Sequence, residues 1–243
     1  GESFGVYKLG FDEDIIKHVS SVNIACGFHA GDPMWMRHTV QLAEKHNVAV
    51  GAHPSFPDFV GFGRRDMIIS ADEAKADLIY QIGALQAFTK EKKIQHVKPH
   101  GAMYNRAVND ETLARAICEA VLEVDPHMIL VAMAGSRWSY IAKEMGLRVA
   151  REAFADRVLN DDGTLVSRSN PRAVIHDIQQ VEQQGLGIIT KGMATSITGN
   201  DVEVQADTLC LHGDTPGAVN MASTLRQKIE AEGIPILPLN KLI

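Results

Sequence analysis

Side chains that can carry protons or bind metal ions follow short apolar runs at several places in this 243-residue sequence. VNIAC at 22–26 is followed by His29 and Asp32, and VAVGA at 48–52 is followed by His53. The same pattern recurs around later runs, with Lys98, His100, Tyr104, Asn105, Glu152, Asp156, Arg157, His212 and Asp214. Neutral imidazoles and carboxylates are general acid–base groups and also ligands of divalent metals. We therefore expect one site for acid–base chemistry, metal binding or both, with His29, His53, His100 and His212 as candidate metal ligands.

Each of these residues also has a structural interpretation. Asp32 directly precedes Pro33 and is equally compatible with a helix N-cap, which leaves capping and catalysis both open. Asp214 is placed in the same way before the last predicted helix, and His53 before Pro54 is compatible with a turn. Four histidines at corresponding positions favour a shared site, although no H-E-x-x-H or comparable spacing specifies a metal. The catalytic candidates are His29, Asp32, His53, His100, His212 and Asp214.

Positive charges are candidates for binding a substrate anion. Arg64 and Arg65 lie in the aromatic, glycine-rich segment PSFPDFVGFGRRD at 54–66, as either exposed loop charges or an anion clamp. The candidate substrate-binding residues are Arg64, Arg65, Lys98, Tyr104, Asn105, Glu152, Asp156, Arg157 and Arg168. Five further histidines lie on predicted helices or near their ends and are expected on solvated surfaces: His18, His38, His46, His127 and His176.

The elements that position these residues alternate between short apolar runs and amphipathic segments. Strands are predicted at 22–26, 48–52, 95–99, 128–133, 147–152 and 208–212, and IPIL at 234–237 is a candidate seventh. Helices are predicted over 34–46, 71–90, 110–124 and 136–145, and from Thr215-Pro216 to Gly233, while turn signals in 156–204 predict short extended pieces or a hairpin. No G-x-G-x-x-G fingerprint indicates a dinucleotide-binding sheet. We therefore predict one (β/α) TIM-like barrel domain over residues 1–243, with the polar candidates at the carboxyl ends of its strands.

The composition excludes some partners. The formal net charge of −6 argues against a nucleic-acid-binding surface. No apolar run approaches the roughly 20 residues of a membrane-spanning helix, so no membrane partner is expected. Cys26, Cys118 and Cys210 form no C-x-x-C pair. Cys26 and Cys210 lie inside apolar runs and are interpreted as small buried hydrophobes, and a reducing cytoplasm is expected.

Several longer strings together resemble the LamB/YcsF family: NIACGFHAGDP, GAHPSFPD followed by GFGRR, YQIGALQAF, HVKPHGAMYN, REAFADR, NDDGTLVSR and LCLHGD. They extend in colinear order over nearly the whole chain. The resemblance implies a (β/α) barrel of the glycoside hydrolase and polysaccharide deacetylase type in a bacterial, cytoplasmic protein. Family members usually begin with a strand that ends in an Asp-Leu-Asn-x-Asp-x-Gly-Glu-like run. Because Gly1-Glu2 resembles only the tail of that run, we expect the first of seven strands to be truncated.

The resemblance also implies an activity, that of the A subunit of the ATP-hydrolysing 5-oxoprolinase. This enzyme opens the lactam of 5-oxoproline (pyroglutamate) to L-glutamate together with subunits B and C. The chain has no G-x-x-x-x-G-K-[ST] motif, so we expect phosphoryl transfer from ATP to lie mainly with the partner subunits. A homo-oligomer and a bound divalent metal are both compatible with this activity.

The expected roles are assigned to groups of residues rather than to single ones. One of His29, Asp32, His53, His100 or His212 acts as general base on water, and another protonates the leaving nitrogen. Lys98 or Arg157 stabilises negative charge, and one of Arg64, Arg65 or Arg168 holds the substrate carboxylate. Two alternatives stay open: a stand-alone metal-dependent deacetylase or amidase, and a non-catalytic subunit that binds the substrate.

Overall fold

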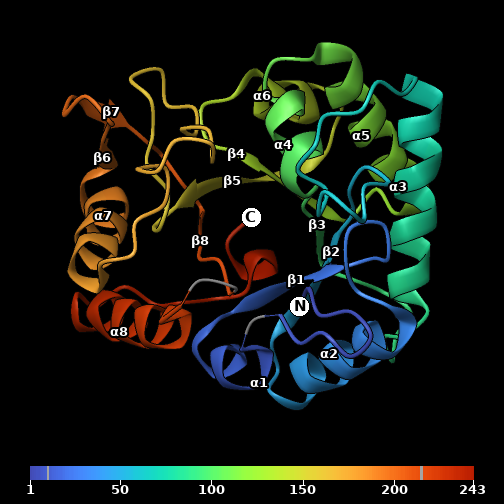
Figure 1. Cartoon of the computed structure of the whole chain (residues 1–243), viewed down its shortest axis with the longest axis horizontal. Coiled ribbons are helices and arrows are strands. Elements are labelled where there is room, and N and C mark those ends of the chain that lie inside the picture. The colour runs from blue at the N-terminus through green and yellow to red at the C-terminus, as the bar shows by residue number, and fades with distance from the viewer. Residues whose placement is uncertain (10, 214–215) are drawn as a thin grey trace.

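A curled sheet of parallel strands forms the centre of the molecule (Figure 1). The computed structural model describes residues 1–9, 11–213 and 216–243. The sheet has six strands in the order β1-β2-β3-β4-β5-β8. They are β1 (Ser21–Ala25), β2 (Ala49–His53), β3 (His96–Val97), β4 (Ile129–Met133), β5 (Arg148–Phe154) and β8 (Thr208–Cys210). Because all neighbouring pairs are parallel, the carboxyl ends of the strands meet at one end of a half-barrel that is consistent with a TIM-like barrel.

Helices cover the outer face of this sheet (Figure 1). They are α1 (Asp12–Ile15), α2 (Pro33–Lys45), α3 (Ala71–Gln86), α4 (Gly101–Ala107), α5 (Glu111–Val124), α6 (Arg137–Glu144), α7 (Ile178–Lys191) and α8 (Ala218–Ala231), with 3-10 turns at Ile16–His18 and Leu239–Lys241. Apolar residues at helical spacing on α3 and α5, such as Leu78, Ile82 and Ile117, are fully buried in the main core. All five residues of β4 are buried, as expected for a strand covered on both faces.

The predicted strands lie within about two residues of the observed ones, and several end signals are confirmed. Ser70 and Glu73 form the predicted capping box at the start of α3. Gly146 and Gly233 follow the ends of α6 and α8 with positive φ angles of 89° and 75°. The turn signals in 156–204 correctly predicted a hairpin, which β6 (Met193–Thr195) and β7 (Asp201–Glu203) form.

Other predictions about the elements were wrong. IPIL at 234–237 forms no strand, because Ile234 and Ile236 pack against the core between α7 and α8. The described part of the chain therefore contains six parallel strands rather than seven. Helices α4 and α7 were not predicted, and α8 begins at Ala218 after Gly217, later than expected. Thr215, the predicted cap of that helix, lies outside the described residues.

The N-terminal segment pairs with the edge of the sheet. The Gly1 nitrogen donates to the Asn23 carbonyl at 3.0 Å, and the Gly1 carbonyl accepts from the Ala25 nitrogen at 3.0 Å. This is the hydrogen-bond pattern of a parallel bridge opposite Ile24. It fixes the position of the following residue, Glu2, beside the carboxyl end of β1. None of the helices in the described ranges is both long enough and apolar enough to cross a membrane.

Candidate functional site

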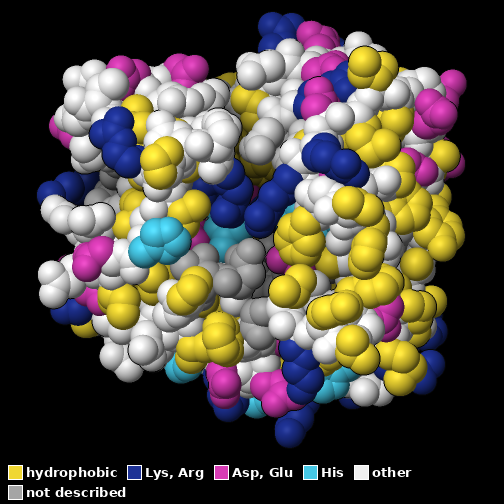
Figure 2. Space-filling model, viewed as in Figure 1, with side chains coloured by type: hydrophobic (Ala, Val, Ile, Leu, Met, Phe, Trp, Pro, Cys, Tyr) yellow, Lys and Arg dark blue, Asp and Glu magenta, His cyan; other side chains and the backbone are white. Residues whose placement is uncertain are grey.

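A cavity of about 730 Å³ opens at the carboxyl ends of the strands. Among the predicted residues its lining contains His53, Arg64, Lys98, His100, Tyr104, Asn105, Arg157, Arg168 and His212. Figure 2 shows the hollow near the centre of this face, with Lys and Arg side chains gathered around it and His side chains beside them. The strand ends therefore bring together residues that lie more than 150 positions apart in the sequence, from His53 to His212.

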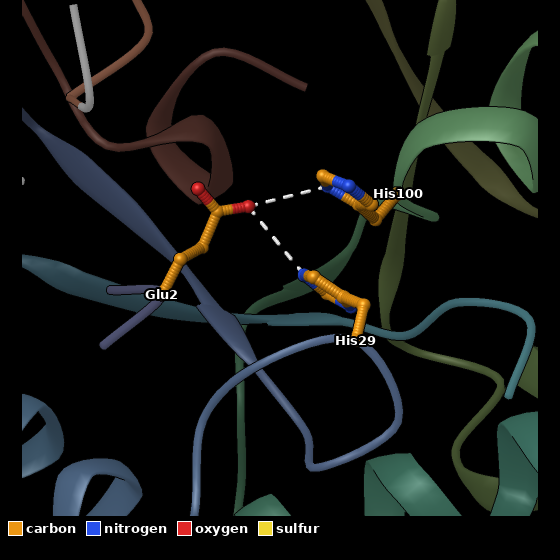
Figure 3. Close-up of side chains that lie close together, drawn as sticks. All are labelled: Glu2, His29 and His100. Carbon is orange, nitrogen blue, oxygen red and sulfur yellow. Dashed lines mark ion pairs between the residues drawn. The ribbon is translucent and has the colours of Figure 1, made fainter. Parts of the chain in front are cut away.

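Three histidines and one glutamate converge on one wall of this cavity. His29 follows β1, His53 ends β2, and His100 follows β3 as the N-cap residue of α4. The Glu2 Oε1 atom lies 3.4 Å from His29 Nε2, 3.2 Å from His100 Nδ1 and 3.9 Å from His53 Nε2. Figure 3 shows Glu2 pointing at the two rings of His29 and His100, which stack with centroids 3.9 Å apart. Burial lowers the pKa of His29 to about 4, so this imidazole is neutral at pH 7.

Hydrogen bonds on the far side of each ring fix the orientation of these histidines. His53 Nδ1 contacts the Lys98 carbonyl at 2.5 Å, and His100 Nε2 contacts the Phe62 carbonyl at 2.9 Å. His29 Nδ1 contacts the Ser55 hydroxyl at 2.8 Å. Carbonyl oxygens only accept, so the ring nitrogens of His53 and His100 that face them are donors.

The loop that follows β2 approaches these rings closely. Gly63 has a φ angle of 64°, and a Cβ atom there would lie 2.8 Å from His100 Cδ2 and 3.0 Å from His29 Cβ. Only glycine fits this conformation and this space without strain. The glycine-rich character of 54–66 therefore serves the packing of the loop against the histidines.

A buried ion pair lies at the base of the cavity. The Lys98 Nζ atom is 2.6 Å from Glu152 Oε1 and donates to Cys210 Sγ at 3.1 Å. Burial lowers the pKa of Lys98, but Cys210 and Glu152 raise it by more, so the pKa lies above its ordinary value and the ammonium stays charged at pH 7. Burial raises the pKa of Cys210 to about 12, which keeps this side chain a thiol. The ring of Phe154 lies under the ammonium, 5.1 Å away.

Asp156 and His212 form a second pair at the ends of β5 and β8. His212 Nδ1 is 2.9 Å from Asp156 Oδ2, and the His212 backbone nitrogen donates to the same oxygen at 3.0 Å. Burial raises the pKa of Asp156, but the contacts with His212 lower it by more, so the net pKa is below its ordinary value and Asp156 is a carboxylate. The carboxylate is buried behind the imidazole, and His212 faces the cavity.

Arg157 supplies positive charge that no carboxylate in the described ranges neutralises through a direct hydrogen bond. Its guanidinium is buried and donates to the carbonyls of Val166 at 2.6 Å and Ala173 at 3.1 Å. Burial and then the charge of nearby Arg168 lower the pKa of Arg157 to about 10. Arg64 and Arg168 are exposed at the rim of the same cavity. This cluster is suited to an anionic ligand, which would relieve the repulsion between the guanidinium groups.

Two predicted site residues, Asp32 and Arg65, have structural roles away from the cavity. Asp32 is the N-cap of α2, as the structural interpretation predicted, and its carboxylate accepts from the backbone nitrogens of Gly5, Met34 and Trp35. Arg65 pairs with the buried Asp58 within the loop. We therefore leave both out of the site. Asp214 lies outside the described residues.

Other predicted residues support the cavity from behind or lie far from it. His29, Glu152 and Asp156 are buried next to lining residues, and each contacts one of them directly. The five histidines expected on surfaces are exposed or half-buried: His18, His38, His46, His127 and His176.

Two participants were missed by the sequence reasoning. Glu2 was noted only as the tail of a polar run, and that resemblance was the one signal that pointed to it. Cys210 was interpreted as a small buried hydrophobe, whereas its sulfur accepts a hydrogen bond from Lys98. All three cysteines are free, so no disulfide constrains the site.

Comparisons with known proteins identify the family of this chain. The sequence profile of the LamB/YcsF family matches residues 1–243. This chain belongs to the LamB/YcsF family. Proteins named as the A subunit of 5-oxoprolinase, from Pyrococcus furiosus and from Alkaliphilus metalliredigens, are each 51% identical to it, over 100% of this chain and 96% of the relative. The crystal structure of a lactam utilization protein from Thermus thermophilus matches with a TM-score of 0.90 and 44% identity, over 97% of this chain and 95% of that one.

The strings that resemble the LamB/YcsF family supply most of the site. HVKPHGAMYN contributes Lys98 and His100, and LCLHGD contributes Cys210 and His212. REAFADR contributes Glu152, Asp156 and Arg157, which all lie within or just after β5. In this LamB/YcsF protein, the segments that carry the family likeness are therefore also the segments that build the cavity.

Proposed function

We propose that this protein is the A subunit of a 5-oxoprolinase, which hydrolyses the lactam of 5-oxoproline to L-glutamate in a reaction coupled to ATP hydrolysis. The observation that supports this most is the match over the whole chain to proteins named as the A subunit of 5-oxoprolinase. The structural relative described as a lactam utilization protein supports the same substrate class. We further propose that partner subunits B and C complete the enzyme in the cytoplasm.

The positive cluster gives the substrate carboxylate a place to bind. 5-Oxoproline carries one carboxylate next to its ring, and Arg157 offers a buried guanidinium in the cavity wall. Arg168 and Arg64 at the rim strengthen the positive potential that draws an anion into the cavity. We assign the carboxylate to Arg157 and Arg168, and Arg65 has no part in this assignment because it pairs with Asp58.

Lys98 is placed to stabilise the charge that develops on the lactam oxygen. When water adds to the amide carbon, negative charge develops on the amide oxygen or on the phosphoryl group that activates it, and a fixed cation nearby lowers the barrier. The Lys98 ammonium lines the cavity and is held in place by Glu152 and Cys210. Burial raises the pKa of Tyr104, so its phenol stays protonated beside this ammonium.

His212 is the proposed proton carrier of the reaction. Asp156 accepts from Nδ1 of His212, which leaves Nε2 as the basic nitrogen of the neutral ring. This nitrogen takes a proton from the attacking water. The same proton then goes to the ring nitrogen as the carbon–nitrogen bond breaks, which frees the amino group of glutamate.

ATP supplies the driving force in this proposal. Because the sequence has no Walker-type phosphate loop, we assign the activation of the amide by phosphoryl transfer mainly to the partner subunits. Ring opening of the phosphorylated lactam leaves an acyl phosphate, and a second water cleaves this bond to give phosphate and the side-chain carboxylate. One ATP and two waters are therefore consumed for each glutamate formed. The cavity of this chain receives the ring or its activated form and carries out the hydrolytic step.

The proposal is tested by measuring L-glutamate formed from 5-oxoproline and ATP by the chain with its partner subunits. We expect His212→Asn to lower kcat by roughly 10²–10⁴-fold, the usual contribution of a general base. The matched control is His127→Asn, an exposed histidine that should retain the wild-type rate. Partners that form glutamate equally fast without this chain would overturn the proposal. Glutamate formation by the chain alone without ATP would instead favour the stand-alone amidase.

A further inference from the structure

The ring nitrogens of His29, His53 and His100 that point toward Glu2 all lack a proton when these three rings are neutral. His53 donates from Nδ1 to the Lys98 carbonyl, which leaves a lone pair on Nε2. His100 donates from Nε2 to the Phe62 carbonyl, which leaves a lone pair on Nδ1. These two lone pairs face each other at 3.0 Å.

The third ring follows the same logic through Ser55. The Ser55 hydroxyl donates to the Phe56 carbonyl at 2.8 Å, so it accepts from His29 Nδ1 at 2.8 Å. This leaves a lone pair on His29 Nε2, which is buried and has no hydrogen-bond partner among the described residues. Three imidazole lone pairs and the Glu2 carboxylate therefore meet without a hydrogen atom between them. Such an arrangement is repulsive unless a cation, either a metal ion or a proton on one of the rings, lies between these atoms.

We propose that Glu2, His29 and His100 bind a divalent first-row transition metal ion. Their ligand atoms all lie within 4.8 Å of one another. Four-coordinate zinc with bonds of about 2.0–2.1 Å separates its ligand atoms by about 3.3 Å. The Glu2 Oε1 atom lies 3.4 Å from His29 Nε2 and 3.2 Å from His100 Nδ1, which is close to that separation.

The surroundings of the three ligands are those of a metal centre. In metal sites a ligating histidine donates its other ring N–H to a carbonyl, a carboxylate or a hydroxyl, which fixes the ring and its tautomer. His29 and His100 both have such a partner, in Ser55 and in the Phe62 carbonyl. Two imidazoles and one carboxylate form the ligand set of several catalytic zinc sites, which keep a fourth position for water. Glu2 and His100 line the cavity, so that position faces the substrate space.

The rings of His29 and His100 are parallel and stacked 3.9 Å apart, so at least one of them must tilt for both lone pairs to point at one ion. The binding of the metal rests on this ligand set and its spacing, whereas its use in opening a lactam rests on the proposed function. A bound metal would lower the pKa of a coordinated water and supply a nucleophile in the cavity that His212 and Lys98 also line. The metal test therefore uses the chain without substrate, ATP or partners. Its failure would leave the proposed lactam hydrolysis to be judged by the glutamate assay.

The test is titration of the chelator-treated chain with Zn²⁺ in a calorimeter and with Co²⁺ in a visible-absorption spectrometer. We expect one ion per chain and the absorption bands of a four-coordinate Co²⁺ site. Glu2→Ala, His29→Ala and His100→Ala should each weaken Zn²⁺ binding by at least about 100-fold, and Ser55→Ala by about 10–100-fold. The control is His38→Ala, because His38 forms an exposed pair with Glu13 and should not affect binding.

Circular dichroism and thermal unfolding establish that each variant is folded. If His29→Ala does not fold, Glu2→Ala and His100→Ala decide the matter, since Glu2 is a partly exposed residue of the N-terminal segment. Absence of saturable Zn²⁺ and Co²⁺ binding to the wild-type chain would overturn the proposal. Wild-type affinity in the folded Glu2 and His100 variants would overturn it as well.

Discussion

Replacing Lys98 by methionine removes one half of a buried ion pair, and we expect it to destabilise the folded protein strongly. The Lys98 Nζ and Glu152 Oε1 atoms are 2.6 Å apart, and the two side chains are only 7% and 3% exposed. At an effective dielectric constant of about 20, this separation corresponds to an attraction of about 6 kcal/mol. Removing the two ions from water costs several kcal/mol for each, which offsets most of that attraction. The variant keeps the cost for Glu152 and loses the attraction, so we expect a loss of about 3–5 kcal/mol in the free energy of unfolding.

The measurement is equilibrium unfolding in urea, followed by the fluorescence of the buried Trp138. Glu152→Leu should cost a similar amount, because it leaves the buried ammonium without its carboxylate partner. The double variant K98M/E152L should lie within about 1 kcal/mol of the wild type, since a buried pair replaced by apolar groups is close to neutral.

A surface pair provides the matched control. Lys75 lies 2.8 Å from Glu123 in an ion pair whose side chains are 29% and 59% exposed. Lys75→Met should therefore cost less than about 1 kcal/mol. The reasoning is refuted if Lys98→Met costs no more than Lys75→Met, or if the losses of the two single variants at the buried pair simply add in the double variant.

Three further expectations concern the loop and the helix that surround the site. The hydrogen bond from Arg65 lowers the pKa of the Asp58 carboxyl group in the folded protein. The stabilisation by this carboxylate is therefore complete above about pH 3.9, the pKa of an aspartate in the unfolded chain, and is lost as the pH falls through the lower pKa of the folded state. Asp58→Asn should therefore reduce the urea midpoint at pH 7 and flatten its acid dependence, and an unchanged midpoint would contradict this. Gly146→Ala adds only the strain of a positive φ angle, about 1–2 kcal/mol, because the space around Gly146 is open. Gly63→Ala should cost more stability, because its methyl group also displaces the ring of His100. Equal losses of stability in thermal unfolding would contradict this crowding. Asp32→Ala should lower the unfolding free energy by about 0.5–2 kcal/mol but leave kcat of the assembled enzyme unchanged, and a large loss of kcat in a folded variant would return this residue to the site.

The strands could be predicted from the sequence because each is a short apolar run with both faces covered. The helix α7 could not, because its sequence contains Gly185 and Gly187, which normally indicate a break. In the folded chain a Cβ atom at Gly185 would lie 2.8 Å from Leu225 Cδ1. The glycine therefore allows α7 to approach α8 closely, which is a tertiary requirement that local propensity does not contain.

The histidines of the site were predictable for a geometric reason, since parallel strands place their carboxyl ends together. Glu2 was not, because it follows no apolar run, and its position depends on backbone bonds between Gly1 and β1. Cys210 was not, because a cysteine in an apolar run has the same pattern whether its sulfur packs or accepts a hydrogen bond. Asp32 shows the opposite case, where local capping chemistry alone accounts for the residue.

The contact between Lys98 and Glu152 also has a mechanical consequence for the sheet. The sheet ends at β1 and β8, and in the described residues these two strands share no ladder, so the sheet is open along one seam. Lys98 follows β3, whereas Glu152 belongs to β5 and Cys210 to β8, so the ammonium joins strands that are not neighbours across the concave face. An increase in the diameter of the half-barrel would lengthen these contacts, and a decrease would compress them. The width of the opening is therefore set in part by an electrostatic link, and a charge-neutral residue at position 98 would alter the shape of the cavity together with its potential.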